Sequence, residues 1–200
     1  MSVRRVLVLG LVLAAALALT FYRPGAPKPV VDLTADEQAC ARNLREIYGG
    51  LLLHMGKGTR PLQGSGVGLF AALISSGEWP DDAAHAAKLT CPGPYAEPVP
   101  AGTDYAALAA LTVHSSAYTG RDLAAHPLAK FPCGGDEALV ACDGARGCNH
   151  DGRINVLMCD GSIRTLELEQ LLRTGALPAG TTSIPLGPDS PIPWLRVVPP

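Results

Sequence analysis

The fold of this chain is decided by residues 149–175, NHDGRINVLMCDGSIRTLELEQLLRTG. Polar and apolar residues alternate over residues 153–159 as in a half-buried strand, and residues 162–166 form a second such run. Asp160-Gly161, which separates the two runs, is typical of a two-residue loop with a type I′ turn, in which both central residues need positive φ. The sequence therefore predicts a β-hairpin closed by Asp160 and Gly161.

A two-residue loop also sets the expected register of this hairpin. Met158 is expected opposite Ile163, and Val156 opposite Thr165. The apolar side chains expected to share the face that covers a core are Ile154, Val156, Met158 and Ile163. After the hairpin the apolar period changes to that of a helix, and residues 168–172 followed by Gly175 predict a short helix with a glycine stop.

Composition excludes some classes of function. The formal net charge is −2 and the isoelectric point is near 6.2, so the chain lacks the excess of basic residues that indicates nucleic-acid binding. The 22 glycines and 18 prolines make a fifth of the 200 residues, which predicts many loops. Only 5% of residues are aromatic, and the core is expected to be aliphatic.

The N-terminus has the pattern of a targeting segment. Arg4 and Arg5 precede an apolar run over residues 6–21. Residues 1–22 are expected to be either a cleaved signal peptide or an uncleaved signal anchor, and the sequence leaves both open. Residues 23–33, which contain three prolines, are expected to form an extended linker.

All six cysteines follow this segment, and an even number in an exported domain is typical of disulfides. Free buried thiols and a zinc site are the alternatives. The chain has no CxxC, and the spacing of Cys142 and Cys148 does not fit a zinc knuckle. The cysteines expected to form disulfides are Cys40, Cys91, Cys133, Cys142, Cys148 and Cys159.

A long helix is expected over residues 35–55. Thr34 and Glu37 have the spacing of a capping box at its start. One apolar stripe runs along this helix. Gly49 and Gly50 each lower the helix propensity by about 1 kcal/mol relative to alanine. The residues of the stripe are Cys40, Leu44, Ile47, Leu51 and Met55.

The rest of the chain completes an α+β pattern, with a globular head over residues 34–175. Short helices are expected at residues 67–76 and 81–88, and strands at residues 113–118 and 138–142. Residues 143–151 are polar and glycine-rich, which predicts a loop. Residues 176–200 contain seven prolines and are expected to be an extended tail.

Three motifs support a resemblance to a known family. His150 is followed after nine residues by Asp160-Gly161, Cys40 stands shortly before Asn43-Leu44, and Cys91 precedes Pro92. Together they resemble the bacterial prepilin-type, processing-associated proteins, which are pilin-like relatives of the type II secretion pseudopilins. The resemblance implies a head in which one N-terminal helix packs on a small antiparallel sheet, with a Cys40–Cys91 disulfide between the helix and the layer that follows.

The chain departs from the family at its N-terminus, where the usual prepilin peptidase site is lacking. Gly10 is followed by Leu11 rather than by Phe-Thr-Leu, no glutamate follows, and prolines separate the apolar run from the head. The resemblance still implies a non-catalytic structural or interaction protein of the cell envelope, linked to type II secretion or type IV pilus-like systems. Residues 6–22 are expected to anchor it in the inner membrane facing the periplasm, unless cleavage releases it. Its expected partners are other envelope or secretion-system proteins.

Two functions from other classes remain open. Asp143, Asn149 and Asp151 concentrate oxygen ligands beside His150, which is compatible with an envelope binding module that holds calcium or another ligand. His150 itself is expected to make a structural hydrogen bond, with metal binding and catalysis as its alternatives. The third function is an exported hydrolase, but the chain has no GxSxG, HExxH or phosphate-binding loop. We therefore expect no enzyme, and no cofactor other than calcium.

Overall fold

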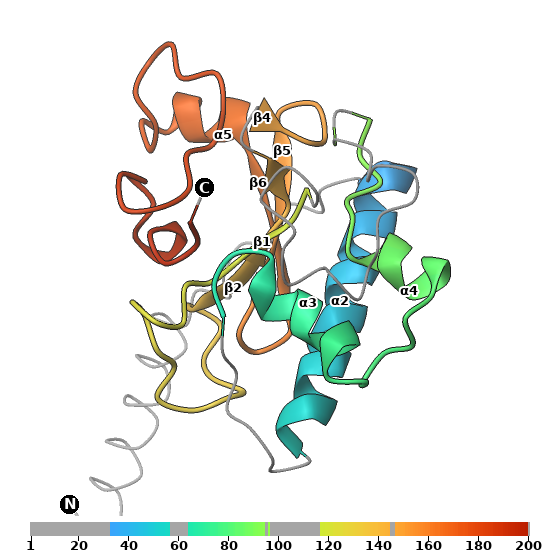
Figure 1. The fold of residues 1–200 in the computed structure, drawn as a ribbon. Helices are drawn as coiled ribbons and strands as arrows, with labels where there is room; N and C mark the ends of the chain where they lie inside the picture. Colours follow the sequence, from blue (N-terminus) through green and yellow to red (C-terminus); the bar gives the residue numbers. More distant parts are fainter. Residues whose placement is uncertain (1–32, 57–63, 95, 97–116, 145–146, 200) are drawn as a thin grey trace, which may run out of the picture. The chain divides into compact units, whose positions relative to one another are not determined.

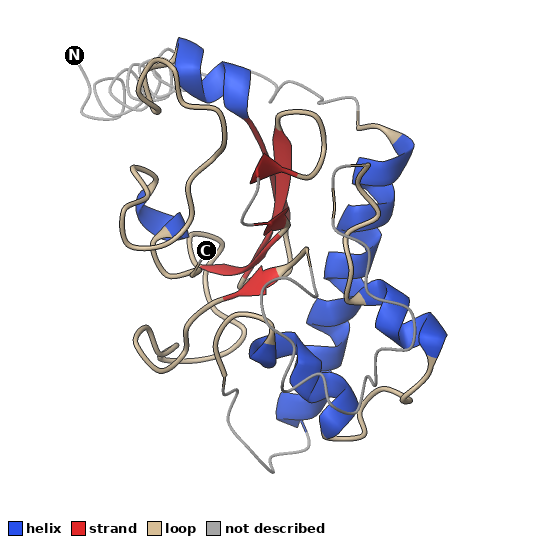
Figure 2. Cartoon of the chain, turned by 45° about the horizontal axis from the view of Figure 1, so that its top comes forward, coloured by secondary structure: helices blue, strands red, loops and turns tan. Residues whose placement is uncertain are grey.

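The computed structural model describes residues 33–56, 64–94, 96, 117–144 and 147–199. The expectations for residues 1–32 and for residues 113–116 of the predicted strand 113–118 lie outside the described residues, and the strand does not include residues 117 and 118. Within the described part of the chain, no helix combines the length and the hydropathy needed to cross a bilayer. The described residues contain α-helices and an antiparallel sheet, as the α+β prediction requires (Figure 2).

The long helix is α2, Ala35–Gly56. Its predicted capping box is confirmed. The backbone N–H of Thr34 donates to Glu37 Oε2 over 2.6 Å, and the N–H of Glu37 donates to Thr34 Oγ1 over 3.3 Å. The predicted apolar stripe is buried from Cys40 to Leu51, and Met55 at its end is half-buried. The hydrophobic side of α2 therefore faces a core.

Two short helices follow, α3 (Gly68–Ser75) and α4 (Ala83–Lys88), close to their predicted positions. The helix α3 contacts α2. A Cβ at Gly50 would lie 2.9 Å from both Leu73 and Trp79, whereas one at Gly49 would meet nothing within 4 Å. Gly50 therefore gives up helix propensity in exchange for close packing of α2 against residues 73–79.

The main sheet has the strand order β1-β2-β5-β6, and every neighbouring pair is antiparallel. Its strands are β1 (Thr119–Gly120), β2 (Ala138–Ala141), β5 (Arg153–Met158) and β6 (Ile163–Glu167). A separate ribbon pairs β3 (Asp143–Gly144) with β4 (Gly147–Cys148) in the segment predicted to be a loop. The hairpin leads into α5 (Leu168–Arg173), and Gly175 has a φ of +72° just beyond it, as predicted.

The predicted position of the hairpin is right, but the turn type and the register are wrong. Ile163 pairs with Leu157, and Val156 with Arg164, one residue away from the predicted register. Of the Asp160-Gly161 pair, only Gly161 has positive φ, at +84°. A single left-handed glycine is typical of a three-residue loop with a bulge. Such a loop leaves Cys159 in the connection, where its N–H donates to the carbonyl of Glu137.

The type I′ geometry occurs instead at another Asp-Gly pair of the chain, Asp151-Gly152. Both of these residues have positive φ, +40° and +79°. The N–H of Arg153 donates to the carbonyl of His150 across this turn, over 2.8 Å. The turn therefore holds His150 beside the start of β5.

The register decides which side chains share a face. Ile154, Val156 and Met158 point away from α2, while Leu157 and Ile163 point toward it. The prediction that Ile163 shares a face with the other three is therefore wrong. The residues of β5 from Ile154 to Met158 are all buried, so this strand is covered on both faces.

The second cover of the sheet is residues 176–199, which were predicted to be an extended tail outside the head. They have little regular structure beyond the 3₁₀ turn η3, Pro193–Leu195. They nevertheless belong to the same compact unit as the head, which extends from Leu33 to Pro200. Figure 1 shows this segment on one side of the sheet and α2 on the other. The tail side chains buried there are Leu177, Ile184, Ile192, Leu195 and Val198.

Candidate functional site

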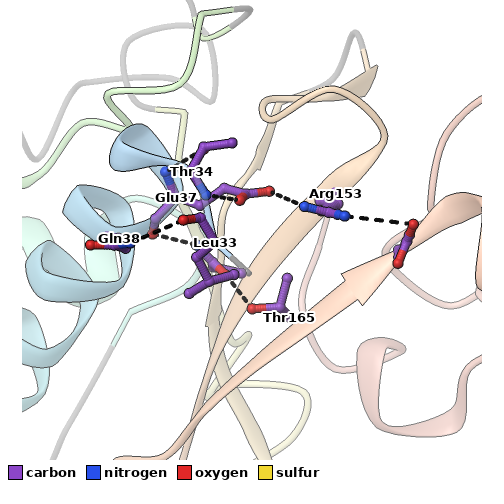
Figure 3. Close-up of polar contacts among 8 residues, drawn as sticks. Leu33, Thr34, Glu37, Gln38, Arg153 and Thr165 are labelled. Carbon is purple, nitrogen blue, oxygen red and sulfur yellow. Dashed lines mark hydrogen bonds and ion pairs between the residues drawn. The ribbon is translucent and has the colours of Figure 1, made fainter. Parts of the chain in front are cut away.

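The N-terminal end of α2 is fixed to the sheet by polar contacts, shown in Figure 3. The side chain of Glu37, which is 2% exposed, lies 3.4 Å from the guanidinium of Arg153. Asn155 donates to the carbonyl of Glu37 over 3.0 Å and accepts from Thr165 over 2.7 Å. The capping residue Glu37 thus also fixes the position of the helix relative to β5.

One turn further along α2, Cys40 lies in a cluster of three thiols and one imidazole. Cys91 lies in the loop after α4, Cys142 is the single residue between β2 and β3, and His150 lies in the turn before β5. The ligand atoms of these four residues all lie within 4.8 Å of one another. All four residues are buried, with exposed fractions from 0 to 6%. Four separate segments of the fold therefore meet at this cluster.

The shortest contacts in the cluster involve Cys91, Cys142 and His150. The Sγ atoms of Cys91 and Cys142 are 2.9 Å apart. Nε2 of His150 lies 3.1 Å from the Sγ of Cys91 and 3.4 Å from that of Cys142. The other ring nitrogen, Nδ1, is buried and has no hydrogen-bond partner among the described residues. The polar contacts described for this ring are thus with sulfur.

Two sulfurs of the cluster also receive a hydrogen bond from an amide nitrogen. The backbone N–H of Gly93 donates to Cys91 over 3.3 Å, and Nδ2 of Asn149 donates to Cys142 over 3.6 Å. Donors of this kind stabilise negative charge on sulfur.

The surroundings act differently on the thiols of Cys40 and Cys142. Burial raises the pKa of Cys40, but hydrogen bonds with Cys142, Cys91, His150 and Asn155 outweigh it, and the net pKa lies well below the ordinary value of a thiol. Burial raises the pKa of Cys142, and its contacts with Cys40 and Cys91 raise it further. The neighbours of Cys40 therefore favour negative charge on its sulfur more than the neighbours of Cys142 do.

The predicted Cys40–Cys91 disulfide is not formed, because both residues are free thiols that face Cys142 and His150 as well as each other. Of the six cysteines, Cys133 and Cys159 are joined, with a Cα–Cα distance of 5.2 Å. This disulfide ties the loop before β2 to the tip of the hairpin. Cys148 lies half-buried in β4 and packs against the core on the tail side of the sheet.

The three residues of the predicted motif occupy the two ends of β5. His150 precedes the strand and belongs to the buried cluster, whereas Asp160 and Gly161 follow it. Asp160 is exposed and accepts hydrogen bonds from the N–H and the hydroxyl of Ser162. The spacing of the motif is therefore the length of one strand plus its two turns, and its members do not form a common site.

The three residues predicted to bind calcium make different contacts in the structure. Asn149 is buried, and its amide nitrogen donates to the carbonyl of Ala117 and to Cys142. Asp151 is exposed in the type I′ turn, and the backbone of Asp143 pairs with Cys148. A calcium site formed by Asp143, Asn149 and Asp151 stays a prediction.

A pocket of about 370 Å³ lies beside the cluster, with His150 in its wall. Arg153 is the one lysine or arginine among its lining residues, against five carboxylate side chains. These carboxylates belong to Asp36, Glu37, Asp151, Glu167 and Glu169. An excess of negative charge favours cations near His150.

Sequence spacing could not reveal this cluster. Zinc motifs are recognised when ligands lie close together in the chain, but Cys91 and His150 are 59 residues apart. The signal that was present is that Cys40, Cys91 and His150 each belong to one of the three motifs of the resemblance. Cys142 carried no such signal.

Comparisons of the chain with protein-family models, curated proteins and solved structures find no match. The resemblance to pilin-like proteins therefore stays a prediction from the three motifs.

Proposed function

We propose that this chain is an exported, non-catalytic structural or interaction protein of the bacterial cell envelope, with the plan of a pseudopilin head. The observation that supports this most is the packing of α2 along one face of a small antiparallel sheet. The helix begins directly after the Pro-rich linker, which follows the apolar residues 6–21. A helix in that position suits a head carried by an N-terminal membrane segment.

Surface features of α2 are compatible with a role in interaction. Leu52 and Leu53 are the large hydrophobic side chains exposed on the described part of the chain, at 37% and 62%. Both lie in the last turns of the helix, away from its buried stripe. Contact with other envelope or secretion-system proteins is the role that fits these features.

Fractionation of a Gram-negative host that expresses the full chain tests this proposal. We expect the protein in the membrane fraction, resistant to added protease in intact cells and digested once the outer membrane is opened. A photoreactive residue in place of Leu53 is expected to cross-link to envelope proteins, whereas one in place of the exposed Glu169 is not. Recovery of the protein from the cytoplasm, or equal cross-linking from both positions, would contradict the proposal.

A second function, an envelope binding module, is favoured by the acidic pocket beside His150. Calcium at millimolar concentration would then raise the melting temperature, because a ligand that binds only the folded state stabilises it. The variant Asp151→Asn should reduce this shift, and magnesium should not reproduce it. An unchanged melting temperature would contradict a calcium site in this pocket.

A further inference from the structure

We propose that Cys40, Cys91, Cys142 and His150 together bind one zinc ion as a closed structural site. This inference does not depend on the proposed role in the cell envelope. Three thiolates and one imidazole are an established ligand set of structural zinc sites. The four ligand atoms lie within 4.8 Å of one another and come from four segments of the fold.

The distances become those of a tetrahedral site after small movements of the ligands. Zinc lies about 2.3 Å from sulfur and about 2.0 Å from nitrogen, so neighbouring ligand atoms stand roughly 3.5–3.8 Å apart. In the structure the sulfurs of Cys91 and Cys142 are 2.9 Å apart, and Nε2 of His150 lies 3.1 and 3.4 Å from them. These three atoms would move outward by a few tenths of an ångström, and the widest separation in the cluster, up to 4.8 Å, would shorten by about 1 Å.

Charge balance favours the same assignment. Binding releases the protons of the thiols to solvent, and three thiolates with one Zn²⁺ leave a net charge of −1 in a buried position. That charge needs hydrogen-bond donors at the sulfurs. Gly93 and Asn149 supply nitrogen donors to the sulfurs of Cys91 and Cys142.

A disulfide explains less of the cluster. A bond between any two of the three cysteines would leave the third thiol and His150 without a role. His150 is 3% exposed, its Nε2 points at sulfur, and its Nδ1 has no hydrogen-bond partner among the described residues. A metal ion at Nε2 would account for the burial of this ring between two thiols.

The site is expected to be structural rather than catalytic. Four protein ligands complete the usual coordination of zinc, and all four are buried. The ion would join α2 to the loop after α4, to the end of β2 and to the start of β5. The acidic pocket beside His150 provides an approach for a cation.

The experiment uses the full chain, purified in mild detergent without reductant or chelator. We expect about one zinc per chain by elemental analysis, and Co²⁺ exchanged into the protein should show the visible absorption of tetrahedral thiolate coordination. Alkylation after unfolding with chelator should modify Cys40, Cys91 and Cys142. A disulfide between any two of these three cysteines, or absence of stoichiometric metal, would overturn the proposal.

Matched variants separate a lost ligand from a lost fold. His150→Gln is expected to remove zinc, whereas His150→Cys is expected to keep it and to raise the thiolate-to-cobalt charge-transfer band in the ratio of four thiolates to three. Cys148→Ser removes a thiol outside the cluster and should leave both the metal content and the spectrum unchanged. A cobalt spectrum that does not change in His150→Cys would overturn the assignment of His150 as a ligand.

Discussion

At the scale of single residues, one glycine decides the geometry of the central hairpin. Gly161 has a φ of +84°, and a Cβ there would lie 2.6 Å from the ring of Tyr48 on α2. The loop therefore needs glycine for its backbone conformation and for the approach of the helix to the hairpin tip. The hydroxyl of Tyr48 also donates to the carbonyl of Cys159, over 3.3 Å.

We predict that Gly161→Ala lowers the free energy of unfolding by about 2–3 kcal/mol, of which a left-handed alanine accounts for about 1–2 kcal/mol and the contact with Tyr48 for the rest. Gly175 is the control, because its φ is +72° but a Cβ there meets nothing within 4 Å. Gly175→Ala should therefore cost only about 1–2 kcal/mol. Urea unfolding measures both, and equal losses in the two variants would show that the contact with Tyr48 is not needed.

The other turn residue, Asp160, gives the hairpin a dependence on pH. Hydrogen bonds from the Ser162 hydroxyl and then from the Ser162 N–H lower the pKa of the Asp160 carboxyl. A carboxyl whose pKa is lower in the folded state stabilises the fold above its unfolded pKa, and this contribution is lost as the pH falls through the folded value. The effect is expected below about pH 4, the ordinary pKa of aspartate.

Ser162→Ala removes the largest of these causes and should therefore flatten the loss of stability on acidification. The measurement is the urea midpoint at pH 7 and at pH 3 for the wild-type chain, Ser162→Ala and Asp160→Asn. We expect the two variants to lose less stability than the wild type between these pH values. The same loss in all three proteins would show that Asp160 does not contribute.

At the scale of elements, the sequence predicted what depends on neighbours in the chain. Three such predictions follow from residues no more than four positions apart, and all three are confirmed. They are the capping box of Thr34 and Glu37, the buried stripe of α2 and the stop at Gly175. The predicted register of the hairpin was wrong because three residues, 159–161, form the loop instead of the predicted two. Of the chain's three Asp-Gly pairs, Asp151-Gly152 has the positive φ values of a type I′ turn, whereas at Asp160-Gly161 the preceding Cys159 lies in the loop and is joined to Cys133.

The packing of α2 on the residues after it leads to a prediction at this scale. Gly50→Ala gains helix propensity, but its methyl group would meet Leu73 and Trp79 at 2.9 Å. Crowding of a packed interface costs about 1–3 kcal/mol, so we expect a net loss of about 1 kcal/mol. Gly49→Ala meets no neighbour and should gain about 0.5–1 kcal/mol. Thermal unfolding of the pair decides this, and stabilisation by both substitutions would contradict the close approach.

At the scale of the whole molecule, both the cluster and the cover of the sheet depend on contacts between distant segments. The four residues of the cluster come from segments that no local period relates, so their spacing carried no zinc motif. The apolar residues of the tail are separated by prolines, and such a pattern predicts neither helix nor strand. The sequence did contain one signal that both faces of β5 are covered. Ile154, Val156, Leu157 and Met158 are all apolar, so apolar side chains point to both faces of the strand, and all four are buried.

The tail is therefore predicted to be part of the folding unit. Leu195 is fully buried in η3, against the face of the sheet that α2 does not cover. We expect Leu195→Ala to lower the free energy of unfolding by about 2–5 kcal/mol, as in other buried positions. Asp189→Ala, at an exposed position of the same segment, should change it by less than about 0.5 kcal/mol.

Removal of residues 176–200 should have a larger effect than either substitution. The five buried tail side chains each contribute about 1.5–3 kcal/mol by burial, which together is comparable to the whole stability of a domain. The shortened chain is therefore expected to bind a hydrophobic dye and to lose its cooperative thermal transition. If residues 176–200 instead formed a separate extended tail, the shortened chain would unfold cooperatively at the temperature of the full chain, and Leu195→Ala would be as mild as Asp189→Ala.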